Sequence, residues 1–347
     1  MRLKFRLPWI IFLILAGFLL TYISWWTGAL YLSHIENKWI DGKRNDGWEI
    51  EFSERTKTGF PLRWRSNYRE ITIKTPSDKK KSLHWSSNYV FFDWSPLNPR
   101  DLSVVASGKT LTKAFDKSPE KLFELSFDGL NIDISTAEHD RKRYTFFAKR
   151  IETLGGNLNS VIFHNPKLKL TLSPEKYENS IPKLARLNVS AEKIELPNQS
   201  KNSANFPIKR LLLRGDIYGN FRTKKLRPRE ALSEWGQSGG AIEINELKAD
   251  WGGINFQSVG TYSVDQELRL LASLKIEASG FRKLFQSLAK TGVLEGSDLF
   301  LLQMLLSGLG AKNSGNNEDK ISIPITAQDG WLAVGPIRLL KLRPILN

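Results

Sequence analysis

Two arginines, Arg63 and Arg65, are the residues of this chain whose type and spacing best suit ligand chemistry. They stand two positions apart in the stretch Thr58-Gly-Phe-Pro-Leu-Arg-Trp-Arg65, so they share one face of an extended strand. Guanidinium groups hold phosphate and carboxylate groups bidentately. We predict that these arginines contact an anionic headgroup, with Phe60 and Trp64 as apolar neighbours. The alternative interpretation is a turn at Gly-Phe-Pro that carries a hydrophobic plug.

Residue types that serve catalysis or metal binding are scarce or badly spaced. The 347-residue chain has no cysteine and only four histidines, which excludes cysteine-based zinc sites, iron–sulfur centres and disulfide scaffolds. No zinc-protease spacing and no phosphate-binding glycine loop occurs. Gly236-Gln-Ser-Gly-Gly240 matches the G-x-S-x-G elbow, but an expected helix precedes it and an expected strand follows, the reverse of the required order. We therefore expect a flexible loop there, and a protein that is not an enzyme and uses no cofactor or metal.

The N-terminus predicts a membrane anchor. Residues 7–33 carry no charge and have aromatic side chains near both ends, as in helices that cross the roughly 30 Å core of a bilayer. The basic residues Arg2, Lys4 and Arg6 precede this run and predict a cytoplasmic N-terminus. A cleaved signal peptide is the alternative, but the apolar run is longer than usual and no A-x-A-like site follows it. We expect residues 1–33 to form a cytoplasmic stub and a single-pass inner-membrane anchor, with the remainder in the periplasm.

The chain is basic, with 51 Lys and Arg against 36 Asp and Glu. Outside the cytoplasm, such a surface meets anionic lipid headgroups and acidic polymers rather than nucleic acid. We therefore expect a lipid or glycolipid ligand, with envelope proteins as candidate partners and no nucleic acid. The alternative interpretation is that the positive charge serves only to keep the domain soluble.

Alternating apolar and polar residues dominate the sequence after residue 46. In the clearest case, Leu268, Leu270, Leu274 and Ile276 alternate with polar residues. This period is typical of strands with one buried face, and therefore of antiparallel sheets. The sequence predicts a mainly β protein in which residues 47–347 form a large curved antiparallel sheet, or two β subdomains. The apolar face of this strand is a candidate ligand-binding surface.

Few helices are expected, and two or three of them should cover one face of the sheet. Residues 34–46 predict a juxtamembrane helix that Gly47 ends. Residues 228–236 begin with proline and end with glycine, as helices do, and residues 281–291 and 297–308 have helical spacing. The last segment is apolar nearly all round, so it either packs against the sheet or dips into lipid. Polar residues predict loops at 197–205 and 312–320, and Asp329-Gly330 predicts a hairpin turn.

Four islands rich in Gly, Pro and Trp carry a family resemblance. They are Thr58 to Arg63, Trp94-Ser-Pro-Leu-Asn-Pro-Arg-Asp-Leu102, Leu247-Lys-Ala-Asp-Trp-Gly252, and Asp329-Gly-Trp-Leu-Ala-Val-Gly-Pro336. Through them the chain resembles an uncharacterised alphaproteobacterial family, catalogued as domain of unknown function 2125. The chain departs from the pattern at Leu62, where an aromatic residue is expected, and at Arg343, where a proline is expected. The resemblance implies an anchored, β-rich envelope protein and names no activity. More loosely, the chain is similar to AsmA/TamB-type proteins, which carry lipids in the groove of a curved sheet.

The sequence thus predicts a membrane-anchored envelope protein that binds or handles lipid or glycolipid through an apolar sheet face. One alternative is a non-enzymatic structural or scaffold protein of envelope assembly, in which the side chains of the sheet fill a closed core. A periplasmic hydrolase acting through Ser238 is a third interpretation, which requires a pocket with converging catalytic groups.

Overall fold

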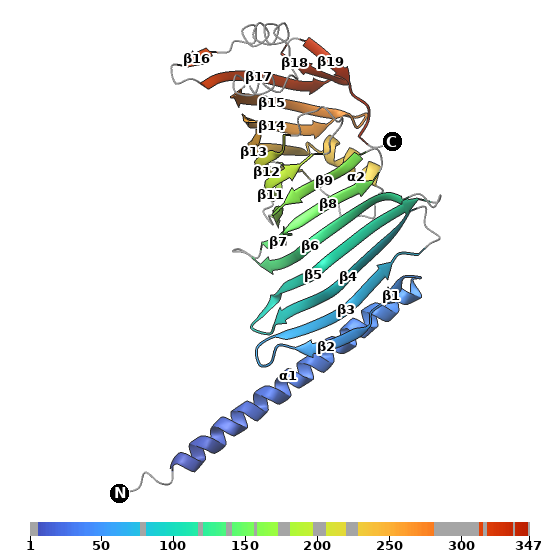
Figure 1. Ribbon diagram of the computed structural model, residues 1–347, viewed down its shortest axis with the longest axis vertical. Coiled ribbons are helices and arrows are strands. Elements are labelled where there is room, and N and C mark those ends of the chain that lie inside the picture. The colour runs from blue at the N-terminus through green and yellow to red at the C-terminus, as the bar shows by residue number, and fades with distance from the viewer. Residues whose placement is uncertain are drawn as a thin grey trace. The chain divides into compact units, whose positions relative to one another are not determined.

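The computed structural model describes residues 6–76, 81–116, 121–136, 141–155, 158–172, 181–196, 206–219, 228–280, 312–314, 318–335 and 337–345. Two compact units make up the chain: residues 1–135 with 153–156, and residues 136–152 with 157–347. Strands dominate both units (Figure 1), so the predicted β class is confirmed. The helices predicted at 281–291 and 297–308, and the loop predicted at 197–205, lie outside the described residues.

The first unit consists of a long helix and an antiparallel sheet. Its elements are α1 (Arg6–Asn45), β1 (Glu49–Glu51), β2 (Glu54–Thr58), β3 (Trp64–Lys74), β4 (Lys81–Ser95), β5 (Asn98–Asp116) and β6 (Lys121–Thr136). Both β1 and β2 pair with β3, and β3 to β6 pair in chain order as an antiparallel meander. Short connections between sequential strands favour this arrangement.

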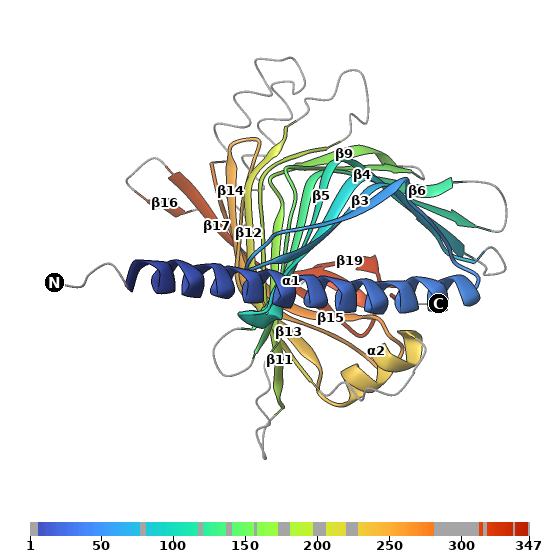
Figure 2. The same ribbon diagram turned by 90° about the horizontal axis from the view of Figure 1, so that it is seen from below.

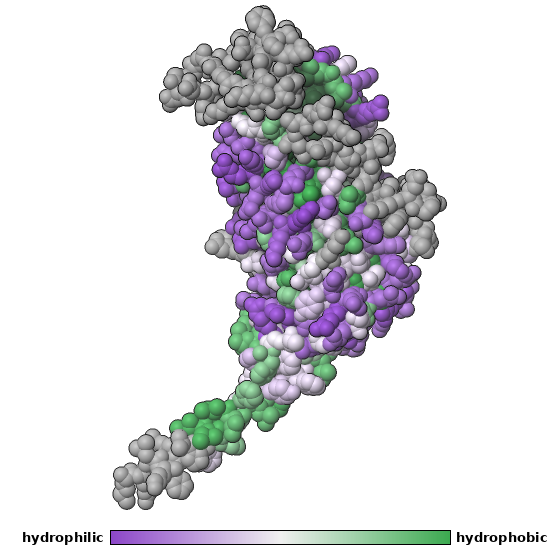
Figure 3. Space-filling model, in the orientation of Figure 1, coloured by the Kyte–Doolittle hydropathy of each residue, from purple (hydrophilic) through white to green (hydrophobic). Residues whose placement is uncertain are grey.

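Helix α1 is continuous over 40 residues, so the anchor and the juxtamembrane helix, which the sequence predicted as separate segments, are one helix. Its first half is apolar and exposed: the side chains from Trp9 to Leu15 are each about half to two thirds exposed. Among the described residues, α1 is the one helix that is long and apolar enough to cross a membrane. Figure 3 shows hydrophobic residues along its first half. The helix ends where Gly47 adopts a positive φ of 81°.

The second half of α1 packs on the sheet of the first unit. Its less exposed residues recur every three or four positions, which places them on one face of the helix; they are Trp25, Gly28, Ala29, Leu32, Ser33, Glu36 and Ile40. Ala29 and Ile40 are each 6 % exposed. Figure 2 shows β3 to β6 curving over this half of the helix. Helix and sheet are therefore packed together rather than joined by a linker.

The second unit is an antiparallel sheet with one helix among the described residues. Its elements are β7 (Lys142–Phe147), β8 (Arg150–Gly155, partly in the first unit), β9 (Leu158–His164), β10 (Lys167–Leu172), β11 (Lys183–Glu195), β12 (Ile208–Tyr218), α2 (Pro228–Gln237), β13 (Ala241–Trp251), β14 (Ile254–Val264), β15 (Leu270–Ser279), β16 (Lys312–Ser314), β17 (Glu318–Gln328), β18 (Trp331–Val334) and β19 (Ile337–Lys341). The main ladder runs from β7 through β10 to β15, and then to β17, β18 and β19.

Three local predictions can be compared with this unit. The helix predicted at 228–236 is confirmed as α2, and the hairpin turn at Asp329-Gly330 is confirmed between β17 and β18. The loop predicted at 312–320 is wrong, because β16 pairs with the start of β17 as a hairpin. The polar composition of that segment is compatible with a hairpin because β16 has only three residues and pairs with only the first three of β17.

The closest approach of helix and sheet generates the first prediction. A Cβ atom built on Gly28 would lie 2.0 Å from the indole ring of Trp64. We expect Gly28→Ala to lower the free energy of unfolding of the purified full-length protein by about 1–3 kcal/mol, because it overpacks this contact. Gly42→Ala on the same helix is the matched control, since no atom lies within 4 Å of its Cβ position. Equal stability of the two variants in denaturant unfolding would contradict the packing.

Candidate functional site

An apolar face runs across the sheet of the first unit. Residues directly opposite each other in an antiparallel pair point to the same side. Pairing therefore forms three rows on one face: Trp64–Trp94–Leu102–Ile134, Ser66–Phe92–Val104–Ile132 and Tyr68–Val90–Ala106–Leu130. The third row is buried, whereas Phe92 in the second row is 36 % exposed. Helix α1 contacts β1 and β3 at one end of this face, and the partial exposure of Phe92 leaves some of the apolar surface uncovered.

The second unit has an apolar face of its own that extends over eight strands. One row is Phe146–Leu168–Val189–Leu213–Leu247–Ser258–Ile276–Ile323, and the next is Tyr144–Leu170–Leu187–Gly215–Ile244–Gly260–Leu274–Ile325. Most of these side chains are half-buried, and Leu168 is 38 % exposed. A closed core would bury them almost completely. The described part of this unit therefore presents a broad apolar surface.

Helix α2 closes one end of the apolar face of the second unit. Trp235 is 5 % exposed and packs against Val264 and Leu268, beside Ile242. Its indole nitrogen donates a hydrogen bond to the carbonyl oxygen of Tyr218 at 2.8 Å. This end of the sheet is a conventional core.

The apolar-face residues singled out from the sequence fall into two groups. Leu270, Leu274 and Ile276 lie on β15, with Leu274 and Ile276 in the rows described above. Leu268 precedes the strand with a φ of 61° and is 2 % exposed in the core under α2. It therefore does not line the apolar face, because the chain turns at residues 265–268, where the Leu268 backbone nitrogen donates to the carbonyl of Asp265.

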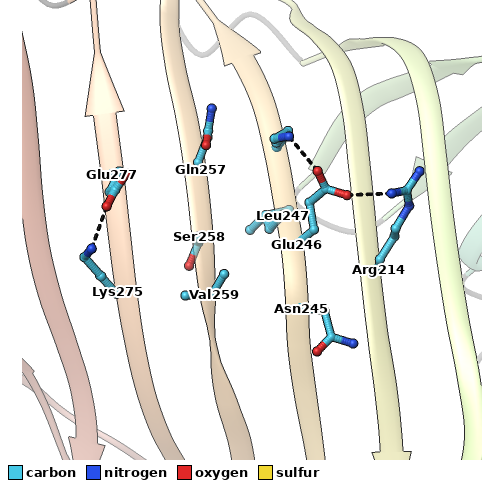
Figure 4. Close-up of a pocket in the computed structure, with 10 residues that line it drawn as sticks. Arg214, Asn245, Glu246, Leu247, Gln257, Ser258, Val259, Lys275 and Glu277 are labelled. Atoms are coloured by element: carbon cyan, nitrogen blue, oxygen red, sulfur yellow. Dashed lines mark hydrogen bonds and ion pairs between the residues drawn. The ribbon is translucent and has the colours of Figure 1, made fainter.

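The opposite face of this sheet is polar and internally paired. Glu246 accepts from Arg214 at 2.9 Å and from Lys248 at 2.6 Å, and Lys275 lies 2.6 Å from Glu277 (Figure 4). The hydrogen bond from Lys248 lowers the pKa of Glu246. These groups line a shallow depression of about 420 Å³. Since its charged groups pair with each other, this depression is a weaker ligand site than the apolar face.

The two arginines predicted to bind a headgroup converge on an acidic partner. Asp93 on β4 is opposite Arg65 on β3, and both Arg63 and Arg65 form ion pairs with its carboxylate, the latter at 3.1 Å. The Asp93 side chain is 5 % exposed, whereas that of Arg63 is 61 % exposed. The Arg65 guanidinium lies 4.4 Å from the ring centroid of Phe91. Arg63 therefore retains a solvent-facing guanidinium edge, and Arg65 mainly holds the strands together.

Phe60 and Trp64, predicted from the sequence to lie beside a headgroup site or in a hydrophobic plug, both contact helix α1. Phe60 packs edge-on against Phe18, Tyr22 and Trp25 at centroid distances of 5.5 to 5.9 Å. Trp64 stacks on Trp94 at 4.8 Å. The Trp64 indole donates to the carbonyl of Trp25 at 2.9 Å, and the Trp25 indole donates to the carbonyl of Arg63 at 2.7 Å. This reciprocal pair fastens the β2–β3 loop to α1.

A second polar contact joins α1 to the sheet at Glu36. Its carboxylate accepts from Lys57 at 2.5 Å, from the hydroxyl of Tyr68 at 3.0 Å, and from Ser66. Burial lowers the pKa of Lys57, although its hydrogen bond to Glu36 opposes this effect. Burial and the Glu36 charge both raise the pKa of Tyr68. Tyr68 therefore remains a neutral donor, and the helix is held by directed hydrogen bonds as well as by packing.

The described residues show neither a metal-binding cluster nor a free serine nucleophile at Ser238. Among the described residues, no group of three or more His, Asp or Glu side chains is placed to hold a metal ion. Ser238 lies between α2 and β13, and its hydroxyl donates to the carbonyl of Trp235 at 2.9 Å. The serine is therefore engaged in ending the helix.

Sequence reasoning missed Asp93 and Glu36. Asp93 stands in an alternating stretch, Val90 to Trp94, where its polar position is unremarkable. Only the strand register, which places it opposite Arg65, marks it as the partner of the two arginines. Glu36 lies in the segment predicted as a juxtamembrane helix, where other polar residues surround it in the sequence. Glu36 precedes Ile40 by four residues, so both lie on the same side of the helix, and Ile40 is buried. This spacing could have indicated that Glu36 faces the sheet.

The Arg63–Asp93–Arg65 cluster generates the second prediction. We expect Asp93→Asn to lower the free energy of unfolding by about 1.5–3 kcal/mol, because hydrogen bonds from two charged donors to a buried carboxylate are lost. Arg63→Gln is the control, with a change within about 0.5 kcal/mol, since that side chain is largely solvated. Denaturant unfolding of full-length protein measures both, and a larger effect at Arg63 would contradict the assignment.

Comparison with known proteins places the chain in a family without giving it an activity. No curated protein matches it, and no solved structure matches it. A family model described as "Uncharacterized protein conserved in bacteria (DUF2125)" matches residues 25–343. The match includes the docked half of α1 and both sheets, and it confirms the family resemblance read from the glycine, proline and tryptophan islands. The chain therefore belongs to the bacterial family DUF2125.

Proposed function

We propose that this protein is anchored in the bacterial inner membrane by α1, and that it holds the acyl chains of a lipid or glycolipid on its apolar sheet faces in the periplasm. The half-buried apolar rows are the observation that carries this proposal. In the second unit these rows extend over eight strands, and Ser258 is a small polar residue within the first row. On this reading the protein is a binding protein and not an enzyme.

The anchor is supported by the length of the apolar part of α1. Residues 7–24 precede the half of the helix that packs on β3, and they extend about 27 Å at 1.5 Å per residue, close to the hydrocarbon thickness of a bilayer. Within them, Phe18 and Tyr22 contact Phe60 of the β2–β3 loop. The helix continues without a break into the half that packs on β3. Cleavage after the apolar run, as in a signal peptide, would remove Trp25 and Gly28 from their contacts with Trp64. These contacts favour an uncleaved anchor.

The energetics favour an apolar ligand over an empty face. Burying a methylene group contributes about 0.8 kcal/mol, so roughly ten methylenes of one acyl chain would contribute about 8 kcal/mol before the loss of chain entropy is subtracted. Exposed apolar patches larger than a few hundred Å² on soluble domains mark binding surfaces. The paired charges on the opposite face supply no comparable driving force.

A scaffold function is the second candidate, and one observation favours it. The strand β19 is the last in the sheet of the second unit, and its Leu339 and Leu340 are 59 % and 57 % exposed. Exposed apolar strands at the edge of a sheet pair readily with other chains. A partner protein in envelope assembly would then add a strand at β19.

The third prediction tests lipid binding directly. We expect a photo-crosslinking amino acid at Leu274 in the full-length protein, expressed in bacteria, to yield lipid adducts on irradiation. Ser273 is the matched control, because it is exposed on the opposite face of the same strand. Mass spectrometry of the purified protein identifies the adducts. Adducts at neither position, in a protein of unchanged circular dichroism, would favour the scaffold.

The fourth prediction compares the two faces of the sheet by introducing one negative charge on each face in turn. We expect Leu274→Asp to abolish adduct formation at a crosslinker placed at Leu213, because Leu213 lies on the same face and a buried carboxylate opposes apolar binding. Ser273→Asp introduces the same charge on the other face and should leave the adducts unchanged. Equal loss in both variants would indicate a general disturbance of the sheet and contradict the assigned face.

A further inference from the structure

The loop between β2 and β3 packs against a part of α1 that is needed to cross the bilayer. Counted from Leu7, a span of about 20 residues ends near Trp26. Phe60 contacts the ring of Phe18 at 5.5 Å between centroids, and Phe18 precedes Trp26 by about 12 Å of helix. If the helix crosses the membrane, Phe60 lies at the depth of the lipid rather than above it.

We propose that residues 59–62 of the β2–β3 loop and residues 95–98 of the β4–β5 turn, together called the insertion tip, are embedded in the phospholipid leaflet at the C-terminal end of the span. The proposal rests on the proposed membrane anchoring, and it adds a lipid contact made by the β sheet itself. It is independent of whether the apolar faces bind a lipid ligand.

The two segments of the insertion tip lie together in the first unit. The hydroxyl of Ser95 donates to the carbonyl of Leu62 at 3.1 Å, and Trp94, next to Ser95, stacks on Trp64. The two large apolar side chains that the tip exposes are leucines: Leu62 is 55 % exposed and Leu97 is 69 % exposed. Asn98, at the end of the turn, is exposed and polar. No residue of the tip is charged. Two exposed leucines beside an apolar helix form a surface continuous with the span.

The backbone of the insertion tip is suited to a lipid environment, in which unpaired polar groups are strongly unfavourable. Pro61 and Pro96 have no N–H group to satisfy. At the tip, the nitrogen of Arg63 donates to the carbonyl of Gly59 at 2.9 Å, and the nitrogen of Leu97 donates to the Ser95 hydroxyl at 3.3 Å. Next to the tip, the Trp25 indole donates to the carbonyl of Arg63 at 2.7 Å, and the Trp94 indole donates to that of Pro99 at 2.9 Å. The loop thus carries much of its hydrogen bonding within the protein.

Charge marks the outer boundary of the insertion tip. Arg63 is the last residue of the β2–β3 loop and follows the insertion tip directly. Its guanidinium pairs with Asp93 while the side chain remains 61 % exposed. Arginine at the edge of a membrane segment extends its head to the phosphate level. Tryptophans 25, 64 and 94 lie at the same end of the unit, as aromatic residues do at membrane interfaces. The apolar row that begins with Trp64 and Trp94 therefore starts at the lipid surface.

The chain has no cysteine, so single reporters can be placed in the full-length protein. We would label Leu97→Cys and Leu62→Cys with an environment-sensitive fluorophore, and reconstitute the protein in phosphatidylethanolamine–phosphatidylglycerol vesicles that contain nitroxide lipids. Leu15→Cys, in the middle of the span and exposed, is the control for lipid burial. Asp46→Cys, beyond the end of α1 and 64 % exposed, is the control for water exposure.

We expect the labels at Leu97 and Leu62 to show a blue shift and loss of emission comparable to the label at Leu15, and the label at Asp46 to show neither. Quenching at Leu15 alone would contradict embedding of the insertion tip and would still agree with the membrane anchor. Absence of quenching at Leu15 would overturn the anchor, and the tip with it. Quenching at all four sites would show α1 lying along the surface, which contradicts both.

Discussion

The contact between α1 and β3 is the interaction on which the first unit depends. Trp25 and Trp64 each donate an indole hydrogen bond to the other segment, and Gly28 leaves room for the Trp64 ring. Farther along the helix, Glu36 gathers donors from β2 and β3. Because these bonds are directional, the helix is fixed in rotation and in register as well as in position. A membrane helix fixed in this way determines the orientation of the sheet that it carries.

The sheets are built with two chemically different sides. Apolar residues recur on one side of each strand, and ion pairs such as Arg214 with Glu246 occupy the other. Charged partners opposite one another stabilise a solvated face modestly. Half-buried Leu and Ile side chains stabilise the protein further only when another apolar group covers them. Glycines 215 and 260 stand in the second row of the second unit. A Cβ atom there would lie 2.7 Å from the carbonyl oxygen of Glu243 and 2.2 Å from that of Ser273, so both positions require glycine for close backbone approach. The asymmetry is the physical basis for expecting an apolar ligand there.

Much of this architecture could be predicted from the sequence, because period-two alternation and turn residues are local signals. The strand β15, the helix α2 and the hairpin at Asp329-Gly330 follow from such signals. Local patterns do not report what a residue faces after the chain has folded. Leu268 has the period of a strand residue, yet it lies in a turn under α2, and Arg63 and Arg65 suited an anion but converge on Asp93. Both differences arise from strand register and tertiary packing. In the case of Asp93, these bring together residues that are 30 positions apart in the sequence.

The ladder pattern bears on the choice between a lipid-handling protein and a scaffold. A scaffold that acts through its sheet edge requires only an exposed strand such as β19, and it gains nothing from apolar side chains on the inner rows. Such side chains destabilise the free protein relative to a polar face, because part of their surface remains in water. Eight strands that share this feature are therefore better explained by an apolar occupant than by edge pairing. In the first unit, the row that begins at Trp64 starts beside the helix that we propose as the anchor, so a lipid leaving the membrane at this point would meet an apolar surface rather than water.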